Sequence, residues 1–409
     1  MARRRLDTEI VPNTFDDSFT SELISSINKS FKDKIAYNLD TDLESPTNVK
    51  QYISTGSILL DYIISNKRNG GVPSGRLVEV CGLESTGKSF LGYQILAQTQ
   101  KIGGIAILID TENSTDKDLL PQLGLDVKKL VYLQPDTVED VFETIEHTVK
   151  KIKESNIDRP VTIVWDSVAA TPAKAELDAD YSANTMGLGA RVVSRSLRKI
   201  MKFIGVNNVT LVFINQLRMK LNLMNKYEDP YVSPYGKAIP FHASVRIRLT
   251  HDSKSDLVVK DETDKTKEYS GVGVKAKIVK NKICPPFRTC TFSIEFYKGV
   301  SEDFQLFEKF TQSSPILFKL DGDDYELHAK NGTWHEIIIN NLSQDECVYQ
   351  KKFQKKERKV IVFENEEIRP YIDAALDEIL VKHYSQQEMN ENELVPTDDA
   401  LDAMEGNEE

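Results

Sequence analysis

The sequence predicts an α/β fold with a mostly parallel central sheet that is covered by helices on both faces. Two observations carry this prediction. Between residues 77 and 214, short and continuously apolar segments alternate with amphipathic ones, as in sheets whose strands are buried on both sides. The first apolar segment, residues 77–81, runs directly into the pattern GxxxxGK(S/T), which is typical of a phosphate-binding turn between a strand and a helix.

A helix is expected near the N-terminus, with its start at Asp17/Ser18 and its apolar stripe over residues 19–31. Its apolar positions fall at helical spacing: Leu23, Ile24, Ile27 and Phe31. A single helix of this length needs a surface that covers its apolar stripe. That surface lies either on its own domain or on a neighbouring subunit, and the residues alone leave both possibilities open. A polar linker, residues 38–50, follows.

The remaining elements follow the alternating pattern. The expected strands are 77–81, 105–110, 130–133, 161–166 and 209–214, and the expected helices are 87–101, 116–122, 137–154 and 187–204. Residues 243–250, 271–281 and 290–297 alternate like antiparallel strands, with a charged loop at 252–268. We therefore expect an N-terminal extension and linker (1–50), a core (51–299), a small α/β C-terminal domain (300–385) that ends in a helix at 367–383, and a disordered acidic tail (386–409).

Composition limits the classes of protein. The chain has 409 residues and a net charge of −11, so a nucleic-acid site would have to be a local basic patch. Its four cysteines show no CxxC spacing, which argues against a zinc site or a disulfide framework. No apolar run is long enough to span a bilayer. We expect a cytoplasmic protein without a membrane partner.

The phosphate-binding pattern is complete and predicts a nucleotide site. It comprises Gly82, Leu83, Glu84, Ser85, Thr86, Gly87, Lys88 and Ser89. Backbone N–H groups of such a loop point at phosphate oxygens, the lysine reaches the β- and γ-phosphates, and the Ser89 hydroxyl can bind Mg²⁺.

Polar side chains end three of the expected strands, where ligands of parallel sheets bind. Asp166 follows an apolar strand and is placed to hold Mg²⁺ or its water. Glu112 could accept a proton from an attacking water, and the amide of Gln216 could hydrogen-bond the γ-phosphate. Each of the three could instead be an ordinary polar residue that faces solvent.

Two features suit nucleic acid. One face of the expected helix 187–204 carries four cations, Arg191, Arg195, Arg198 and Lys199. The polar segment 217–240 mixes cations with tyrosines, which suits a single strand whose bases stack: Arg218, Lys220, Lys226, Lys237, Tyr227, Tyr231 and Tyr235. A solvated basic face and loop tyrosines that cap the core are the alternatives.

Several blocks of the chain between Ile53 and Gly299 together resemble the bacterial RecA recombinases. They are Ile53-Ser-Thr-Gly-Ser57, the phosphate-binding loop, Gln134-Pro-Asp-Thr137, Asp166-Ser-Val-Ala-Ala170, Met186-Gly-Leu-Gly-Ala-Arg191, Phe213-Ile-Asn-Gln-Leu-Arg-Met-Lys220, Phe241-His-Ala-Ser-Val-Arg246 and Val279-Lys-Asn-Lys282. The segment Ile27-Asn-Lys-Ser-Phe31 also resembles the helix with which members of this family dock onto a neighbouring subunit. A RecA-type ATPase core is therefore expected.

The resemblance implies roles for individual residues. Lys88 and Gln216 would contact the γ-phosphate, Glu112 would activate water, and Ser89 and Asp166 would hold Mg²⁺. Lys280 and Lys282 would reach the ATP of the adjacent subunit. Further ATP contacts are implied for Phe90 and Asp116. DNA contacts are implied for six residues: Met186, Arg191, Arg198, Arg218, Lys220 and Gly236. Contacts with a neighbouring subunit are implied for Ile27, Lys29, Phe31 and Phe241.

The chain also departs from the family pattern. Leu119 and Phe296 stand where tyrosines near the adenine are usual. The resemblance places the two DNA-contacting loops at residues 178–188 and 217–240. The first loop has Ala179 and Ser182 in place of glycines, and Tyr235 replaces a glycine in the second. The second loop is also slightly longer and carries three additional prolines, Pro230, Pro234 and Pro240. This divergence suggests a remote branch, such as a bacteriophage-encoded version.

The resemblance implies a DNA-dependent ATPase that uses ATP and Mg²⁺, forms homo-oligomeric filaments on single-stranded DNA and pairs it with homologous double-stranded DNA. Single-strand-binding and loader proteins are further partners that it suggests. Two alternatives remain: a ring-forming motor of similar core, such as a helicase or packaging ATPase, and a nucleotide-gated scaffold that binds DNA but hardly hydrolyses ATP.

Overall fold

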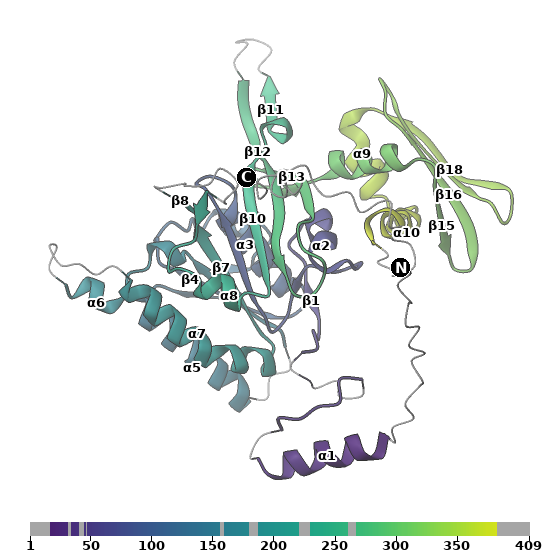
Figure 1. Cartoon of the computed structure of the whole chain (residues 1–409). Helices are drawn as coiled ribbons and strands as arrows, with labels where there is room; N and C mark the ends of the chain where they lie inside the picture. The colour runs from purple at the N-terminus through teal and green to yellow at the C-terminus, as the bar shows by residue number, and fades with distance from the viewer. Residues whose placement is uncertain are drawn as a thin grey trace, which may run out of the picture. The chain divides into compact units, whose positions relative to one another are not determined.

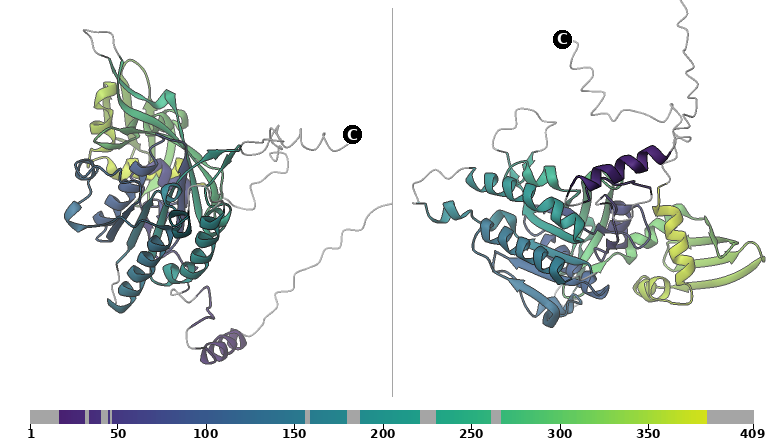
Figure 2. Two further views of the ribbon diagram at one scale, coloured as in Figure 1. Left: turned by 90° about the vertical axis from the view of Figure 1, so that its left-hand side faces the viewer. Right: turned by 90° about the horizontal axis from the view of Figure 1, so that it is seen from below.

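A computed structural model divides the chain into two compact units, residues 1–49 and residues 50–409 (Figures 1 and 2). The structure describes residues 17–31, 34–40, 45, 47–155, 159–179, 187–220, 230–260 and 267–382. Met186, most of the first DNA loop, the middle of the second and the acidic tail that the sequence predicts lie outside these residues. No described helix is long and apolar enough to cross a membrane.

The N-terminal unit contains the predicted helix, α1 (Asp17–Lys29), which begins at the expected Asp17 and ends two residues before the expected Phe31. Asn28 ties the helix to the segment that follows it. Its side-chain oxygen accepts hydrogen bonds of 2.9 Å from the backbone N–H groups of Ile35 and Ala36, and its Nδ2 donates to the Ala36 carbonyl at 2.9 Å. Helix and following segment therefore form one small structural element.

The second unit is built on a ten-stranded mixed sheet with the order β14-β13-β12-β10-β3-β7-β6-β4-β5, in which β11 pairs with β12. The parallel strands are β3 (Leu77–Gly82), β4 (Ile105–Asp110), β5 (Leu130–Leu133), β6 (Val161–Asp166), β7 (Val209–Gln216) and β10 (Val245–His251). The antiparallel strands are β11 (Leu257–Lys260), β12 (Lys267–Asn281), β13 (Thr289–Glu295) and β14 (Gly299–Ser301).

Helices cover both faces of this sheet, as predicted. They are α2 (Ile58–Ser65), α3 (Lys88–Lys101), α4 (Leu119–Gln122), α5 (Val138–Ser155), α6 (Lys174–Leu177), α7 (Leu188–Val206) and α8 (Ala238–His242). One core cluster contains apolar residues of α2, α3 and the sheet, and a second contains those of α5, α7 and the sheet. Successive strand residues alternate between these clusters, because neighbouring side chains of a strand point to opposite faces.

Two expectations for the sheet were wrong. The parallel series was expected to end at 209–214 and residues 243–250 to be an antiparallel strand; β10 is antiparallel to β12, but it is also parallel to β3 and so extends the parallel series. The charged segment 252–268 was expected to be a loop. It contains a 3₁₀ turn (Ser253–Ser255) and β11, which with β12 extends beyond the rest of the sheet in Figure 1.

Short elements complete the core. Two small antiparallel pairs are formed by β1 (Tyr52–Ile53) with β2 (Val72–Pro73) and by β8 (Arg218–Met219) with β9 (Tyr231–Val232). The 3₁₀ turns at Val127–Lys129 and Val168–Ala170 follow α4 and β6. The β8–β9 pair lies within the second predicted DNA loop and gives its two ends a defined backbone path.

The C-terminal part has a separate antiparallel sheet and a third core cluster. Its elements are α9 (Asp303–Ser313), β15 (Ile316–Leu320), β16 (Asp323–Lys330), β17 (His335–Asn341), β18 (Glu346–Phe353), a 3₁₀ turn (Lys355–Glu357), a π-helical turn (Lys359–Phe363) and α10 (Arg369–Leu380). Leu59 of α2 belongs to the same cluster, so the C-terminal part packs on the core of the ten-stranded sheet at this helix.

Candidate functional site

The phosphate-binding pattern folds as predicted, as a loop between β3 and α3. Gly87 is the N-cap of α3 and has a φ of 81°. A Cβ atom there would lie 2.3 Å from Cδ1 of Ile294, and one at Gly82 would lie 2.5 Å from the carbonyl oxygen of Leu249. The loop therefore needs both glycines for space, and Gly87 also for its backbone conformation.

Lys88 directs its ammonium group into this loop. Its Nζ donates a hydrogen bond of 2.5 Å to the carbonyl of Leu83, which also accepts one of 2.9 Å from the Thr86 hydroxyl. Burial lowers the pKa of Lys88, and the charges of Asp166 and Glu112 oppose that shift. This cation is thus poised beside the N-terminus of α3, where phosphate groups bind.

Ser89 and Asp166, the predicted magnesium pair, lie together. Burial raises the pKa of Asp166 to about 6, against a hydrogen bond from the Ser89 hydroxyl that lowers it. The hydroxyl of Tyr93 approaches the same carboxylate at 3.5 Å. A hydroxyl and a carboxylate are hard oxygen ligands, and Mg²⁺ commonly binds through one or two such groups together with water and substrate phosphates. This pair therefore fits a magnesium ion.

Glu112 is positioned by two neighbours. Its backbone N–H donates to Oδ1 of Asp110 at 3.0 Å, and its Oε1 accepts a hydrogen bond from the hydroxyl of Ser167. Register pairing places Asp110 directly beside Asp166 at the ends of β4 and β6. The carboxylates predicted to bind metal and to activate water thus come from adjacent strand ends.

Sequence reasoning gave Asp110 no role, although it organises this edge of the sheet. Its Oδ2 accepts hydrogen bonds from the Thr115 backbone N–H at 3.1 Å and from the Tyr132 hydroxyl at 2.9 Å. Burial raises the pKa of Asp110, but hydrogen bonds from Thr115, Tyr132 and the Glu112 backbone lower it more. Its position at the end of an apolar strand was the signal that could have indicated this role.

Gln216 joins the phosphate-binding loop to the end of β7. Its Nε2 donates to Oε1 of Glu84 at 2.9 Å, and the backbone N–H of Leu217 donates to the Gly82 carbonyl at 3.0 Å. The amide is therefore within reach of the loop, as its predicted contact with the γ-phosphate requires. The exposed loop residues Leu83, Glu84 and Ser85 leave this side open to solvent.

The other residues predicted to contact the nucleotide, together with Leu119, are less closely organised. Phe90 and Leu119 are partly buried and pack against the first core cluster. Asp116 is exposed, and its Oδ1 accepts a hydrogen bond of 2.8 Å from the backbone N–H of Asp118. Leu119 offers an apolar surface without a ring, so stacking of the kind a tyrosine provides is absent at this position.

Lys280 and Lys282 lie at the opposite end of the strands from the phosphate-binding loop of the same chain. Lys280 of β12 lies opposite Arg246 of β10, which in turn lies opposite Glu79 of β3. Glu79 comes three residues before Gly82, where β3 ends and the phosphate-binding loop begins, and three residues span about 10 Å along a strand. The Nζ of Lys280 donates to the carbonyls of Pro240 and Phe241 at 2.6 and 2.8 Å. The structure therefore does not bring these lysines together with Lys88.

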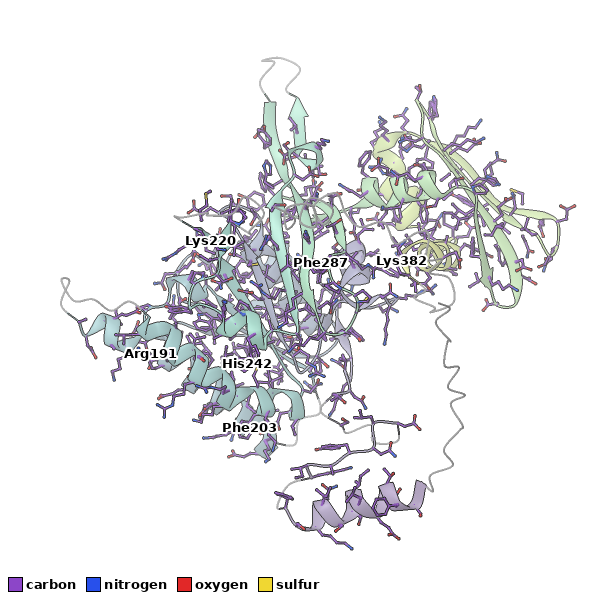
Figure 3. The ribbon with its side chains drawn as sticks, in the orientation of Figure 1. Arg191, Phe203, Lys220, His242, Phe287 and Lys382 are labelled. Carbon is purple, nitrogen blue, oxygen red and sulfur yellow. The ribbon has the colours of Figure 1, made fainter. Side chains whose placement is uncertain are left out.

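A positively charged groove of about 640 Å³ lies between α7 and α8. Its lining residues are Ala190, Arg191, Ser194, Arg198, Tyr235, Gly236, Lys237, Ala238, Phe241 and His242. Burial and the charges of Lys282, Arg198 and Lys280 lower the pKa of His242. Figure 3 labels Arg191 on α7 and His242 at the end of α8. Sequence reasoning missed His242, which only the fold brings to this groove.

The four cations of α7 do not all serve one surface, which corrects the single stripe expected. Arg191 and Arg198 line the groove beside α8, whereas Arg195 and Lys199 line a hollow against the acidic face of α5, which Arg198 also lines. Lys199 forms an ion pair of 2.6 Å with Glu146. A phosphate group in the groove would therefore contact Arg191 and Arg198, whereas the charge of Lys199 is already paired with Glu146.

The ends of the second DNA loop carry the other predicted contacts. Arg218 and Lys220 lie at β8, where the Lys220 backbone N–H donates to the Pro230 carbonyl at 2.9 Å. Arg218 and Gly236 line a second cavity of about 470 Å³, next to the groove. Their DNA contacts stay predictions, as do those of Met186, which lies outside the described residues.

The residues predicted to contact another subunit leave apolar surface exposed. Phe31 is 56% and Phe241 72% exposed. Ile27 is half-buried and Lys29 exposed on α1. Further exposed apolar residues of the N-terminal unit are Phe19, Leu23, Ile35 and Leu39. These apolar side chains of the two units therefore remain open to solvent.

Comparisons with known proteins point to one family. A family model described as the RecA N-terminal domain matches residues 19–301. "Protein RecA" of Helicobacter pylori (strain Shi470) is 37% identical over 338 residues, which cover 80% of this chain and 88% of that protein. "Protein RecA" of Wolinella succinogenes is 35% identical and covers 81% and 84%. "Protein RecA" of Chloroherpeton thalassium is 38% identical and covers 75% and 81%.

Proposed function

Because the chain belongs to the RecA family, we propose that it is a DNA-dependent ATPase that forms filaments on single-stranded DNA and catalyses homologous pairing and strand exchange in recombination and repair. ATP binds at the loop between β3 and α3, and Ser89 and Asp166 hold Mg²⁺. When bound, the ion neutralises charge on the phosphates and orients them. Glu112 accepts the proton of the attacking water, and Gln216 contacts the γ-phosphate.

One observation carries this proposal. The groups that bind phosphate, fit magnesium and accept a proton gather at one end of the strands, whereas Lys280 and Lys282 lie at the other. Cations that stabilise a phosphoryl-transfer transition state can be supplied by a neighbouring molecule. We assign this role to the two lysines, so that each complete ATP site forms between consecutive subunits.

Exposed apolar surface supports assembly into a homopolymer. Large apolar residues of α1 and its following segment are open to solvent, as is Phe241 beside Lys280. Exposed patches of this kind are typical of interaction surfaces. An interface between unlike surfaces of identical subunits produces a ring or an open helix, and the family favours the helix.

DNA is proposed to bind along the groove between α7 and α8. Arg191 and Arg198 provide cations in this groove, Arg218 provides one in the adjoining cavity, and Gly236 lines both. Lys220 directly follows β8, which contains Arg218. Such sites bind the phosphate backbone with a strong dependence on salt. We propose a cytoplasmic location, with single-strand-binding or loader proteins as further partners.

The proposal is tested with Lys88→Ala protein in an assay for joint molecules between single-stranded DNA and a homologous duplex. We expect both ATP turnover and joint molecules to be lost, because the phosphates lose their buried cation. Lys101→Ala is the matched control, since Lys101 is an exposed residue at the other end of α3. Joint molecules formed by Lys88→Ala at the wild-type rate would contradict a recombinase that is driven by ATP.

A further inference from the structure

Tyr235 of the second loop is held in the core in an unusual way. Its φ of 59° is in the left-handed region, which bulky residues rarely adopt. Its ring packs against the second core cluster and fills the space over Gly189 of α7, where an added Cβ would lie 2.2 Å from the ring. Its hydroxyl donates a hydrogen bond to the backbone carbonyl of Thr171. Local strain of this kind persists only when surrounding contacts hold it.

Thr171 ends the turn that follows β6 and is fixed there by its own hydroxyl. The hydroxyl oxygen lies 2.9 Å from the Ser167 carbonyl and 2.7 Å from the Thr111 hydroxyl. It also accepts a hydrogen bond of 3.0 Å from the indole N–H of the fully buried Trp165. The Thr171 hydroxyl therefore holds this end of the turn in place, and Tyr235 is hydrogen-bonded to the same residue.

Ser167 stands at the other end of this turn, and its hydroxyl donates to Oε1 of Glu112. A continuous set of hydrogen bonds thus joins the second loop to the proposed water-activating carboxylate, through Thr171 and Ser167. The bond from Ser167 directs the Glu112 carboxylate toward the turn and occupies one of its oxygens.

We propose that Tyr235 is a positioning residue that keeps Glu112 engaged with Ser167 until DNA occupies the second loop. This inference rests on the proposed function and adds the route by which DNA raises ATP turnover. Arg218 lines the same cavity as Tyr235, and a DNA phosphate drawn to this cation displaces the tyrosine from Thr171. The turn relaxes and Glu112 is released.

The released carboxylate then takes part in hydrolysis. The water oxygen forms a bond to the γ-phosphorus, the proton of the water passes to Glu112, and the bond between the γ-phosphorus and the oxygen of ADP breaks. Tyr235 touches none of the reacting atoms and acts only through the position of Glu112.

The test is ATP turnover by Tyr235→Phe, which keeps the ring and removes the hydroxyl. Without DNA, we expect kcat to rise about two- to tenfold, the range that corresponds to one lost hydrogen bond, with an unchanged KM for ATP. With saturating single-stranded DNA, kcat should equal that of the wild type, so the stimulation by DNA shrinks. Tyr269→Phe is the control, because Tyr269 is an exposed tyrosine on β12; it should retain full stimulation.

A double-mutant cycle with Ser167→Ala tests the route itself. If Tyr235 acts through Ser167, the single variant Ser167→Ala and the double variant Ser167→Ala/Tyr235→Phe should have the same kcat in the absence of DNA. An equal increase in both backgrounds would overturn the proposed route. So would a DNA-free kcat of Tyr235→Phe that equals or falls below that of the wild type, at unchanged melting temperature.

The two proposals fail in different ways. Wild-type protein that hydrolyses ATP at one rate with and without DNA would overturn the proposed function and, with it, the inference. Wild-type protein that is stimulated by DNA, together with a Tyr235→Phe variant that behaves like it, would overturn the inference alone.

Discussion

Glu302 accepts a hydrogen bond of 2.6 Å from the hydroxyl of Ser57 and thereby joins the start of α9 to the N-terminus of α2. It also accepts hydrogen bonds from the backbone N–H groups of Ile58 and Leu59. A carboxylate at this position satisfies donors that α2 would otherwise leave unpaired. The residue just before α9 is thus fixed to the helix that carries Leu59 into the third core cluster.

This buried carboxylate should make stability depend on pH. Burial raises the pKa of Glu302 from 4.5 to about 7, and that of the nearby Asp61 from 3.8 to about 7. At pH values between the ordinary pKa of each group and its raised pKa of about 7, the folded state binds more protons than the unfolded state. The free energy of unfolding therefore falls as pH rises through this range. Relative to Glu302→Gln, the wild type should lose stability between roughly pH 5 and pH 8 in thermal unfolding. Glu308→Gln, at an exposed site on α9, should show no such trend, and a constant difference for Glu302→Gln would contradict the account.

Arg246 compensates a carboxylate within the main sheet. Glu79 of β3 is completely buried, forms an ion pair with Arg246 of β10 and accepts a hydrogen bond of 3.0 Å from Asn215 of β7. Removing one partner of a buried pair leaves an uncompensated charge, so Arg246→Met should destabilise the protein by about 3–5 kcal/mol in urea unfolding. The double variant with Glu79→Gln should regain much of this loss. A loss under about 1 kcal/mol for the single variant would show that the pair is not buried in solution.

His335 should make the C-terminal part sensitive to acid. Its ring is fully buried and stacks on Phe307 at 4.9 Å, and among the described residues neither ring nitrogen has a hydrogen-bond partner. Burial and the charges of Arg358 and Lys355 lower the pKa of His335. The unfolded state then binds the extra proton, so stability is lost as pH falls below about 6.5.

Thermal unfolding of His335→Leu checks this prediction. Its melting temperature should fall less than that of the wild type when the pH is lowered through this range. His147→Gln, at an exposed site on α5, controls for an ordinary histidine. Equal acid sensitivity of the wild type and His335→Leu would count against a neutral, buried imidazole.

The sequence predicted the parallel part of the sheet closely. Strands β4, β5 and β6 begin and end at the predicted residues, because each is a short apolar run between polar turns. Strands β4 and β6 are buried, whereas β5 lies at the edge of the sheet and is partly exposed. The direction of β10 was not predictable in this way. Alternation shows which residues of a strand are buried, but not which neighbours the strand pairs with.

The candidate site was predicted in part. The phosphate-binding loop and the pairing of Ser89 with Asp166 follow from short motifs at strand ends. The hydrogen bond from Tyr235 to Thr171 joins residues 64 positions apart, and only the folded backbone brings them together. The division of the α7 cations has the same origin, since helical spacing could not show that α5 presents Glu146 to Lys199.

The central claim is that each ATP site is completed by lysines of the adjacent subunit. It is tested most directly by mixing two inactive variants, Glu112→Gln and the double variant Lys280→Ala/Lys282→Ala. Each alone should lose at least about 100-fold in DNA-dependent kcat, because one lacks the base and the other the cations. In an equal mixture, about a quarter of random interfaces combine an intact Glu112 with intact lysines, so the mixture should regain about a quarter of wild-type turnover. Turnover no greater than the sum of the two variants would contradict the shared site.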